Sequence, residues 1–155
     1  MTTYVIDTNI FIRLYSWNPR EIKLYDHIWS AIDGAIKSGS MITDSTVQME
    51  LDKHNSPAKE WVKTQMGLVI PMSNEIFVCA QEIMARCPSL VDPESERNHA
   101  DPFIIAAALI KDGVAVSDEK PRKQQSDRCK VPDACDEFGV KCLNFTAFAN
   151  EFPWH

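Results

Sequence analysis

Long hydrophobic runs are missing from this sequence of 155 residues. Its longest apolar segment, Phe103–Ile110, is far too short to cross a bilayer, so we expect no membrane span. No useful apolar run precedes Asp7, and we therefore expect no signal peptide. Internal repeats, low-complexity tracts and linkers are missing too, so residues 1–155 are expected to form a single domain.

Basic residues are fewer than acidic residues in this chain. The chain has 16 basic and 22 acidic residues, which gives a formal net charge of −6. This balance argues against a protein held to nucleic acid by bulk positive charge. It leaves a nucleic-acid enzyme open, because a metal site concentrates acidic residues and its ions reverse the local charge.

Cysteine offers no clear framework for disulfides or zinc. The chain contains Cys79, Cys87, Cys129, Cys135 and Cys142. Their odd number and the lack of a signal peptide favour reduced thiols in a cytoplasmic protein. The last three are too widely spaced for a zinc knuckle and have no interleaved histidine, so ordinary semi-buried cysteines are expected. No Ser-His-Asp or Cys-His arrangement suggests a covalent nucleophile.

Short apolar segments alternate with amphipathic ones along the chain. The segments expected to form strands are 4–6, 41–43, 68–70, 114–116 and 140–143. Apolar residues at helical spacing lie between them, as in 22–36 and 73–87. This alternation predicts an α/β fold with a mainly parallel sheet.

Two helix starts carry recognisable signals. Ser45 and Gln48 fit a capping box, which places Glu50 in the second turn of the helix. Asp101 and Pro102 fit an N-cap residue followed by a first-turn proline.

Acidic residues recur where these elements begin or end. Asp7 follows the first strand, and Asp118 and Glu119 follow the fourth, where ligands of open α/β sheets bind. Glu50 lies within a helix, and Asp101 would lie at the opposite edge of the sheet unless its helix begins over the top. Carboxylates that converge cannot all stay ionised unless a cation joins them. Mg²⁺ takes oxygen ligands of this kind.

Ordinary structural roles remain open for the same residues. Asp7 suits a turn, Glu50 a solvated helix face and Asp101 a helix cap. The basic segment 120–130 suits either a solvated face or contact with phosphates. The tryptophans do not interleave with basic residues, so no base-stacking platform is predicted, and two of them fit core positions. Those two are Trp29 and Trp61.

Four segments together resemble the PIN-domain ribonucleases, a family that includes the VapC-type toxins of prokaryotic toxin–antitoxin pairs. They are Val5–Asn9, the helix around Glu50, Ala100–Ala108 and Ser117–Glu119. The resemblance covers nearly the whole chain in order and approximate spacing. Residues 131–142 are similar to a prokaryotic PIN-like group often placed near the toxins.

The resemblance implies a three-layer α/β/α fold with a sheet in the order 3-2-1-4-5. It also implies a carboxylate pocket for Mg²⁺ or Mn²⁺, endonucleolytic cleavage of RNA, and a toxin role with an antitoxin protein as partner. We further expect a homodimer. Asp7, Glu50 and Asp101 match the acids of the family directly.

The fourth acidic position and its polar neighbour match the family less closely. The family usually reads Thr-x-Asp at the fourth position, so Glu119 is the matching carboxylate and Asp118 the alternative. Asn9 matches a polar position that would orient the first acid or bind a phosphate.

Two other functions stay open. A non-catalytic PIN-like module would bind RNA or a protein, although acids at all four positions disfavour it. A phosphatase of the haloacid-dehalogenase type also places an Asp after its first strand. That chemistry needs a second Asp two residues on, where this chain has Asn9.

Overall fold

A five-stranded parallel sheet forms the centre of the computed structural model, which describes residues 1–94 and 99–154. The strands are β1 (Tyr4–Ile6), β2 (Met41–Asp44), β3 (Val69–Ile70), β4 (Val114–Val116) and β5 (Cys142–Leu143). Their order is β3-β2-β1-β4-β5, and every pairing is parallel. The predicted α/β class and the order 3-2-1-4-5 are therefore confirmed.

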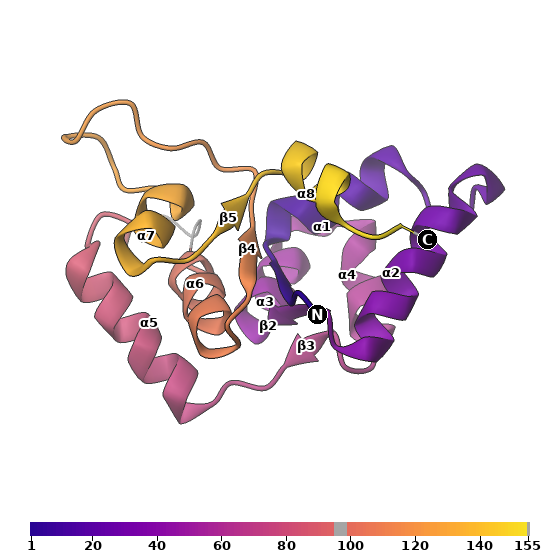
Figure 1. Ribbon diagram of the computed structural model, residues 1–155, viewed down its shortest axis with the longest axis horizontal. Helices are drawn as coiled ribbons and strands as arrows, with labels where there is room; N and C mark the ends of the chain where they lie inside the picture. The colour runs from indigo at the N-terminus through magenta and orange to yellow at the C-terminus, as the bar shows by residue number, and fades with distance from the viewer. Residues whose placement is uncertain (95–98, 155) are drawn as a thin grey trace.

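Helices cover both faces of the sheet, as expected for a parallel sheet buried on two sides. The helical elements are α1 (Thr8–Trp17), η1 (Lys23–Tyr25), α2 (Asp26–Ser38), α3 (Ser45–His54), α4 (Pro57–Thr64), α5 (Asn74–Arg86), α6 (Asp101–Ile110), α7 (Val131–Phe138) and α8 (Phe145–Glu151). Figure 1 shows α5, α6 and α7 on one side of the sheet and α1, α2, α4 and α8 on the other. Helix α3 packs against α1, α4 and β2.

Helix α6 lies in the core. Its residues Ile104–Ala108 are all buried, and it packs against β1, β2 and β4 on one side and α5 on the other. The small side chains of Ala106–Ala108 let neighbouring backbones approach closely. Three residues separate the end of α6 from the start of β4, so the chain reverses direction there. The N-terminus of α6 therefore lies at the carboxyl edge of the strands, and Asp101 with it.

Both predicted N-caps are wrong by one residue. The cap of α3 is Asp44, whose Oδ1 accepts from the Thr46 backbone N–H at 2.8 Å and from the Thr46 hydroxyl. The cap of α6 is Ala100, and Asp101 is its first helical residue. The Asp101 carboxylate is thus not used to cap its own helix.

Other sequence expectations differ in their boundaries. The segment 22–36 splits into the short turn η1 and helix α2, and the last strand covers only Cys142–Leu143. The predicted loop 88–98 is irregular as far as residue 94, and residues 95–98 lie outside the described residues. No helix in the described part of the chain is both long and apolar enough to cross a membrane.

Gly113, between α6 and β4, provides a test of this close packing. A Cβ atom there would lie 2.7 Å from the Thr3 carbonyl oxygen, which accepts from the Val114 N–H. We expect Gly113→Ala to lower the free energy of unfolding by about 1–3 kcal/mol, because backbone atoms must move. The matched change Gly34→Ala meets no neighbour within 4 Å and is expected to stabilise α2 by roughly 0.5–1 kcal/mol. Urea denaturation of both variants measures this, and equal midpoints would contradict it.

Candidate active site

Asp7 stands where β1 ends and α1 begins. As the N-cap of α1, it accepts at Oδ1 from the Thr8 backbone N–H at 2.7 Å. Its Oδ2 accepts from the Ser117 hydroxyl at 2.7 Å, and Ser117 follows the neighbouring strand β4. Only 3% of Asp7 is exposed. The two donors and the helix N-terminus fix the orientation of this carboxylate and favour its charge.

Burial nevertheless has a larger effect on the pKa of Asp7 than these hydrogen-bond donors have. It raises the pKa of Asp7 to about 6, while the hydrogen bonds from Ser117 and Thr8 lower it, and the charges of Glu50 and Glu119 raise it further. A carboxylate that is held in place but poorly compensated is suited to a cation.

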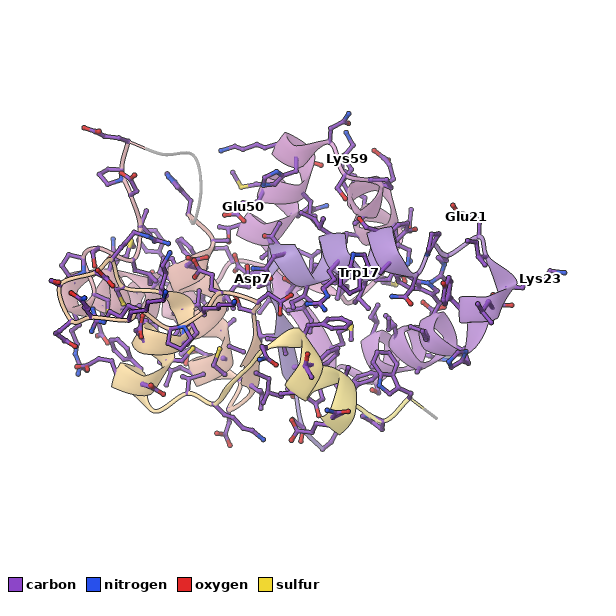
Figure 2. All side chains as sticks on the ribbon, turned by 90° about the horizontal axis from the view of Figure 1, so that it is seen from above. Asp7, Trp17, Glu21, Lys23, Glu50 and Lys59 are labelled. Atoms are coloured by element: carbon purple, nitrogen blue, oxygen red, sulfur yellow. The ribbon has the colours of Figure 1, made fainter. Side chains whose placement is uncertain are left out.

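Glu50 connects the starts of two helices. Its Oε2 accepts from the Thr8 hydroxyl at 2.6 Å, and its Oε1 accepts from the Ala100 backbone N–H at 3.0 Å. Figure 2 shows Asp7 and Glu50 close together beside the start of α1. Glu50 therefore brings the beginning of α6 to the beginning of α1.

Asp101 completes the buried part of the cluster. Burial raises the pKa of its carboxyl well above the usual value, and the charges of Asp7, Glu119 and Glu50 add to this effect. The positive charge of Arg128 acts in the opposite direction. The Asp101 Oδ2 atom is buried and has no hydrogen-bond partner among the described residues.

Asp118 and Glu119, although adjacent, have separate partners. Asp118 accepts from Arg13 at 2.8 Å and from the Phe145 backbone N–H at 2.9 Å. Glu119 lies close enough to Asp7 and Asp101 to raise the pKa of both carboxyls. The structure thus brings Glu119 to the cluster and holds the Asp118 side chain toward Arg13 instead.

Glu119 and Asn9 already have protein partners. Glu119 Oε1 accepts from Arg128 at 3.1 Å, and its Oε2 accepts from the Val131 backbone N–H at 3.0 Å. Asn9 Oδ1 accepts from the Asp118 backbone N–H at 3.2 Å, so Asn9 supports the end of β4. Their assignments as a metal ligand and as a cofactor-binding residue stay predictions.

The donor set fits a hard divalent ion such as Mg²⁺ or Mn²⁺. The partnerless Asp101 Oδ2 is a buried carboxylate oxygen, which is costly to leave without a compensating group. Oxygen ligands of this charge are those that Mg²⁺ takes. Across the described ranges 1–94 and 99–154, no three Asp, Glu, His or Cys side chains are gathered tightly enough to form a complete metal site. The metal role of Asp7, Glu50, Asp101 and Glu119 therefore stays a prediction.

Three supporting residues were not assigned these roles from the sequence. Thr8 and Ser117 each stand directly beside a motif acid, so a search for hydroxyls next to strand-end carboxylates would have found them. Arg128 was one of several basic residues in segment 120–130, and no spacing distinguished it. It donates to Glu119 and, at 2.6 Å, to the Leu90 carbonyl oxygen.

The parallel sheet in the order β3-β2-β1-β4-β5 and its helical layers form a PIN-like fold. The chain belongs to the family described as Domain of unknown function (DUF4411), whose sequence model matches residues 4–155. No curated protein matches the chain by sequence.

The solved structures that share this fold include two crystal structures of VapBC proteins. One is DNA-bound VapBC from Salmonella typhimurium, with 19% identity, a TM-score of 0.54, and coverage of 93% of this chain and 98% of that chain. The other is VapBC2 from Rickettsia felis bound to a DNA fragment from its promoter, with 14% identity, a TM-score of 0.54, and coverage of 92% and 98%. At these identities the likeness concerns the fold.

The raised pKa of Asp7 predicts a specific pH dependence of stability in EDTA. An acid with a folded pKa near 6 and an ordinary value of 3.8 contributes stability below pH 4 that is lost as the pH rises through 6. Asp7→Asn should therefore raise the free energy of unfolding by about 3 kcal/mol at pH 7.5 but only about 1 kcal/mol at pH 4.5. Urea denaturation at both pH values measures this difference.

Glu21→Gln is the matched control. It also removes one negative charge, and Figure 2 shows Glu21 far from Asp7. Its effect should stay within about 0.5 kcal/mol at either pH. A gain for Asp7→Asn that is the same at both pH values would contradict burial as the cause.

Proposed function

We propose that this protein is a divalent-metal-dependent endoribonuclease that hydrolyses phosphodiester bonds of RNA. The observation that carries the proposal is the meeting of two buried carboxylates, Asp7 and Asp101, with Glu50 and Glu119 at the carboxyl edge of the sheet. Acids placed together without enough compensating positive charge are more consistent with a metal site than with a purely structural role.

The residues of the chain have distinct parts in this reaction. Asp7, Glu50 and Asp101, with Glu119, would hold Mg²⁺ or Mn²⁺, and the ion would supply Lewis-acid chemistry that polarises a phosphoryl oxygen and activates water. Ser117 and Thr8 fix the orientation of the Asp7 and Glu50 carboxylates through their hydroxyl donors.

Arg128 supplies positive charge beside this acidic group. It lowers the pKa of Asp101 and contacts Glu119. A guanidinium in this place suits the phosphate backbone of a nucleic acid, which acidic side chains alone would repel.

Two alternative functions are less well supported. A non-catalytic module that binds RNA or a protein has no need of buried acids that destabilise the apo fold. The haloacid-dehalogenase-type phosphatase needs an acid at position 9. Asn9 instead uses its side-chain oxygen to accept from the Asp118 backbone N–H.

We also propose that the protein acts in the cytoplasm as the toxin of a toxin–antitoxin pair. Support comes from the PIN-like fold shared with chains of two VapBC structures. A basic segment of an antitoxin would be attracted to the net negative chain and would pair with the site carboxylates. The expected homodimer belongs to the same proposal.

Metal removal and ligand replacement test the nuclease activity. Purified protein should cleave single-stranded RNA with Mg²⁺ or Mn²⁺ and should lose this activity in EDTA. Asp101→Asn should lower the rate at least about 100-fold, because even outer-shell changes at metal sites cost 10–100-fold. Glu21→Gln should cleave like the wild type. Cleavage that is equal with and without EDTA would rule out the proposal.

Induction in a bacterial host tests the toxin role. Wild-type protein should arrest growth, and the Asp7→Asn variant should not. Co-expression of the antitoxin, expected to be encoded by the gene next to this one, should relieve the arrest. Both proteins are compared at equal soluble amounts by immunoblot. Normal growth with abundant wild-type protein would leave RNA processing as the function.

A further inference from the structure

A pocket of about 510 Å³ opens beyond the carboxyl ends of β4 and β5. Ser117 and Glu119 line it, and the Ser117 hydroxyl is the group that donates to Asp7. The pocket therefore shares a wall with the acidic cluster. Its volume falls in the usual range for small-ligand sites, about 300–1,000 Å³.

The pocket contains positive charge in an otherwise acidic protein. Arg13 and Lys120 both line it, and the chain as a whole carries a formal charge of −6. The acids of the same wall already have basic partners, because Asp118 pairs with Arg13 and Glu119 pairs with Arg128. Lys120 is exposed, and no ion pair within the described residues involves it. An anionic group bound beside the acidic cluster would therefore find Lys120 available as a partner.

An exposed aromatic ring lies next to this positive charge. The Arg13 guanidinium is 4.2 Å from the ring centroid of Trp17 and 4.2 Å from that of Phe145. Trp17 is 63% exposed, whereas Trp29 is 3% and Trp61 6% exposed. Proteins that bind single strands combine cations along the backbone path with aromatic rings on which bases stack.

The aromatic ring of Trp17 also borders a second pocket, of about 460 Å³, which Phe145 lines as well. Trp17, Phe145 and Trp154 give this pocket aromatic walls, and Asn18 adds an amide that can form hydrogen bonds. A planar apolar group with polar edges, such as a nucleobase, suits these walls. Helix α1 connects Asp7 with Trp17 over about 15 Å, so the acids and the aromatic ring lie within reach of one short oligonucleotide (Figure 2).

We propose that the pocket beside β4 and β5, together with Trp17, is the subsite for single-stranded RNA next to the cleaved bond. Lys120 and Arg13 contact a backbone phosphate, and Trp17 stacks on a base. The proposal rests on the proposed ribonuclease function and adds where the substrate lies. The bound RNA strand is unpaired, because a base stacked inside a duplex has no free face for an indole ring.

Binding is measured apart from catalysis, in an Asp7→Asn background with EDTA, by anisotropy of a fluorescently labelled single-stranded RNA. Trp17→Ala should raise the Kd about 5- to 150-fold, since stacking is worth about 1–3 kcal/mol per base. Trp17→Phe should restore part of the affinity, because it retains an aromatic face. Lys120→Met should reduce the slope of log Kd against log salt concentration by about one, which corresponds to the loss of one phosphate contact.

Matched controls remove the same groups elsewhere. Lys23→Met removes a charge that Figure 2 shows far from Asp7, and Leu24→Ala removes an apolar side chain that is 71% exposed. Neither should change the Kd. Circular dichroism melts confirm that each variant folds.

Cleavage assays in the wild-type background separate this proposal from the nuclease proposal. The Trp17 and Lys120 variants should raise KM with little change in kcat. If the wild type cleaves RNA and these variants match it in Kd and KM, the subsite is overturned and the nuclease stands. If the wild type does not cleave but RNA binding depends on Trp17, the nuclease proposal is overturned, and the subsite is overturned as part of a cleavage site although the same surface binds RNA. Tighter binding to a duplex of the same sequence would also overturn the single-strand assignment.

Discussion

The burial of neighbouring carboxylates at one edge of the sheet is the constraint on which the proposed site depends. Asp7 and Asp101 are each 3% exposed, so burial disfavours the ionised form of both, and the charge of Asp7 adds to this effect at Asp101. The fold reduces that cost through helix N-termini and donors from Thr8 and Ser117, but it does not remove it. A chain that keeps such a cost after folding has a site that a cation would stabilise, and this is the physical basis for the ribonuclease proposal.

The end of β4 connects the acids to the surface beside them. Asp118 and Glu119 follow the same strand, yet one pairs with Arg13 and the other with Arg128. Asp118 thereby holds Arg13 near Trp17 and Phe145, while Glu119 stays near Asp7 and Asp101. One turn of the chain therefore positions both the proposed chemistry and the proposed substrate path.

Much of the fold and part of the site were predictable from the sequence. The strand segments and the order of elements follow from local apolar patterns, and the buried positions of Trp29 and Trp61 follow from helical spacing. The helix caps were each placed one residue too late, because Ser45 and Asp101 are good capping residues, whereas Asp44 caps α3 directly at the end of β2 and Asp101 is already the first residue of α6. The family resemblance supplied the sheet order, which periodicity alone does not determine.

The sequence by itself determined which segments form strands and helices, apart from their exact boundaries, and which acids stand near the ends of these segments, because local patterns depend on neighbours a few positions away. Only the tertiary structure decided that Asp101 reaches Asp7, that Glu119 rather than Asp118 joins them, and that Arg13 lies between Trp17 and Phe145. The bonds that fix these arrangements join residues far apart in the chain: Thr8 to Glu50 across 42 positions, Arg13 to Asp118 across 105, and Ser117 to Asp7 across 110. Such contacts depend on how the helices pack around the sheet, and a pattern read along the chain does not contain that packing.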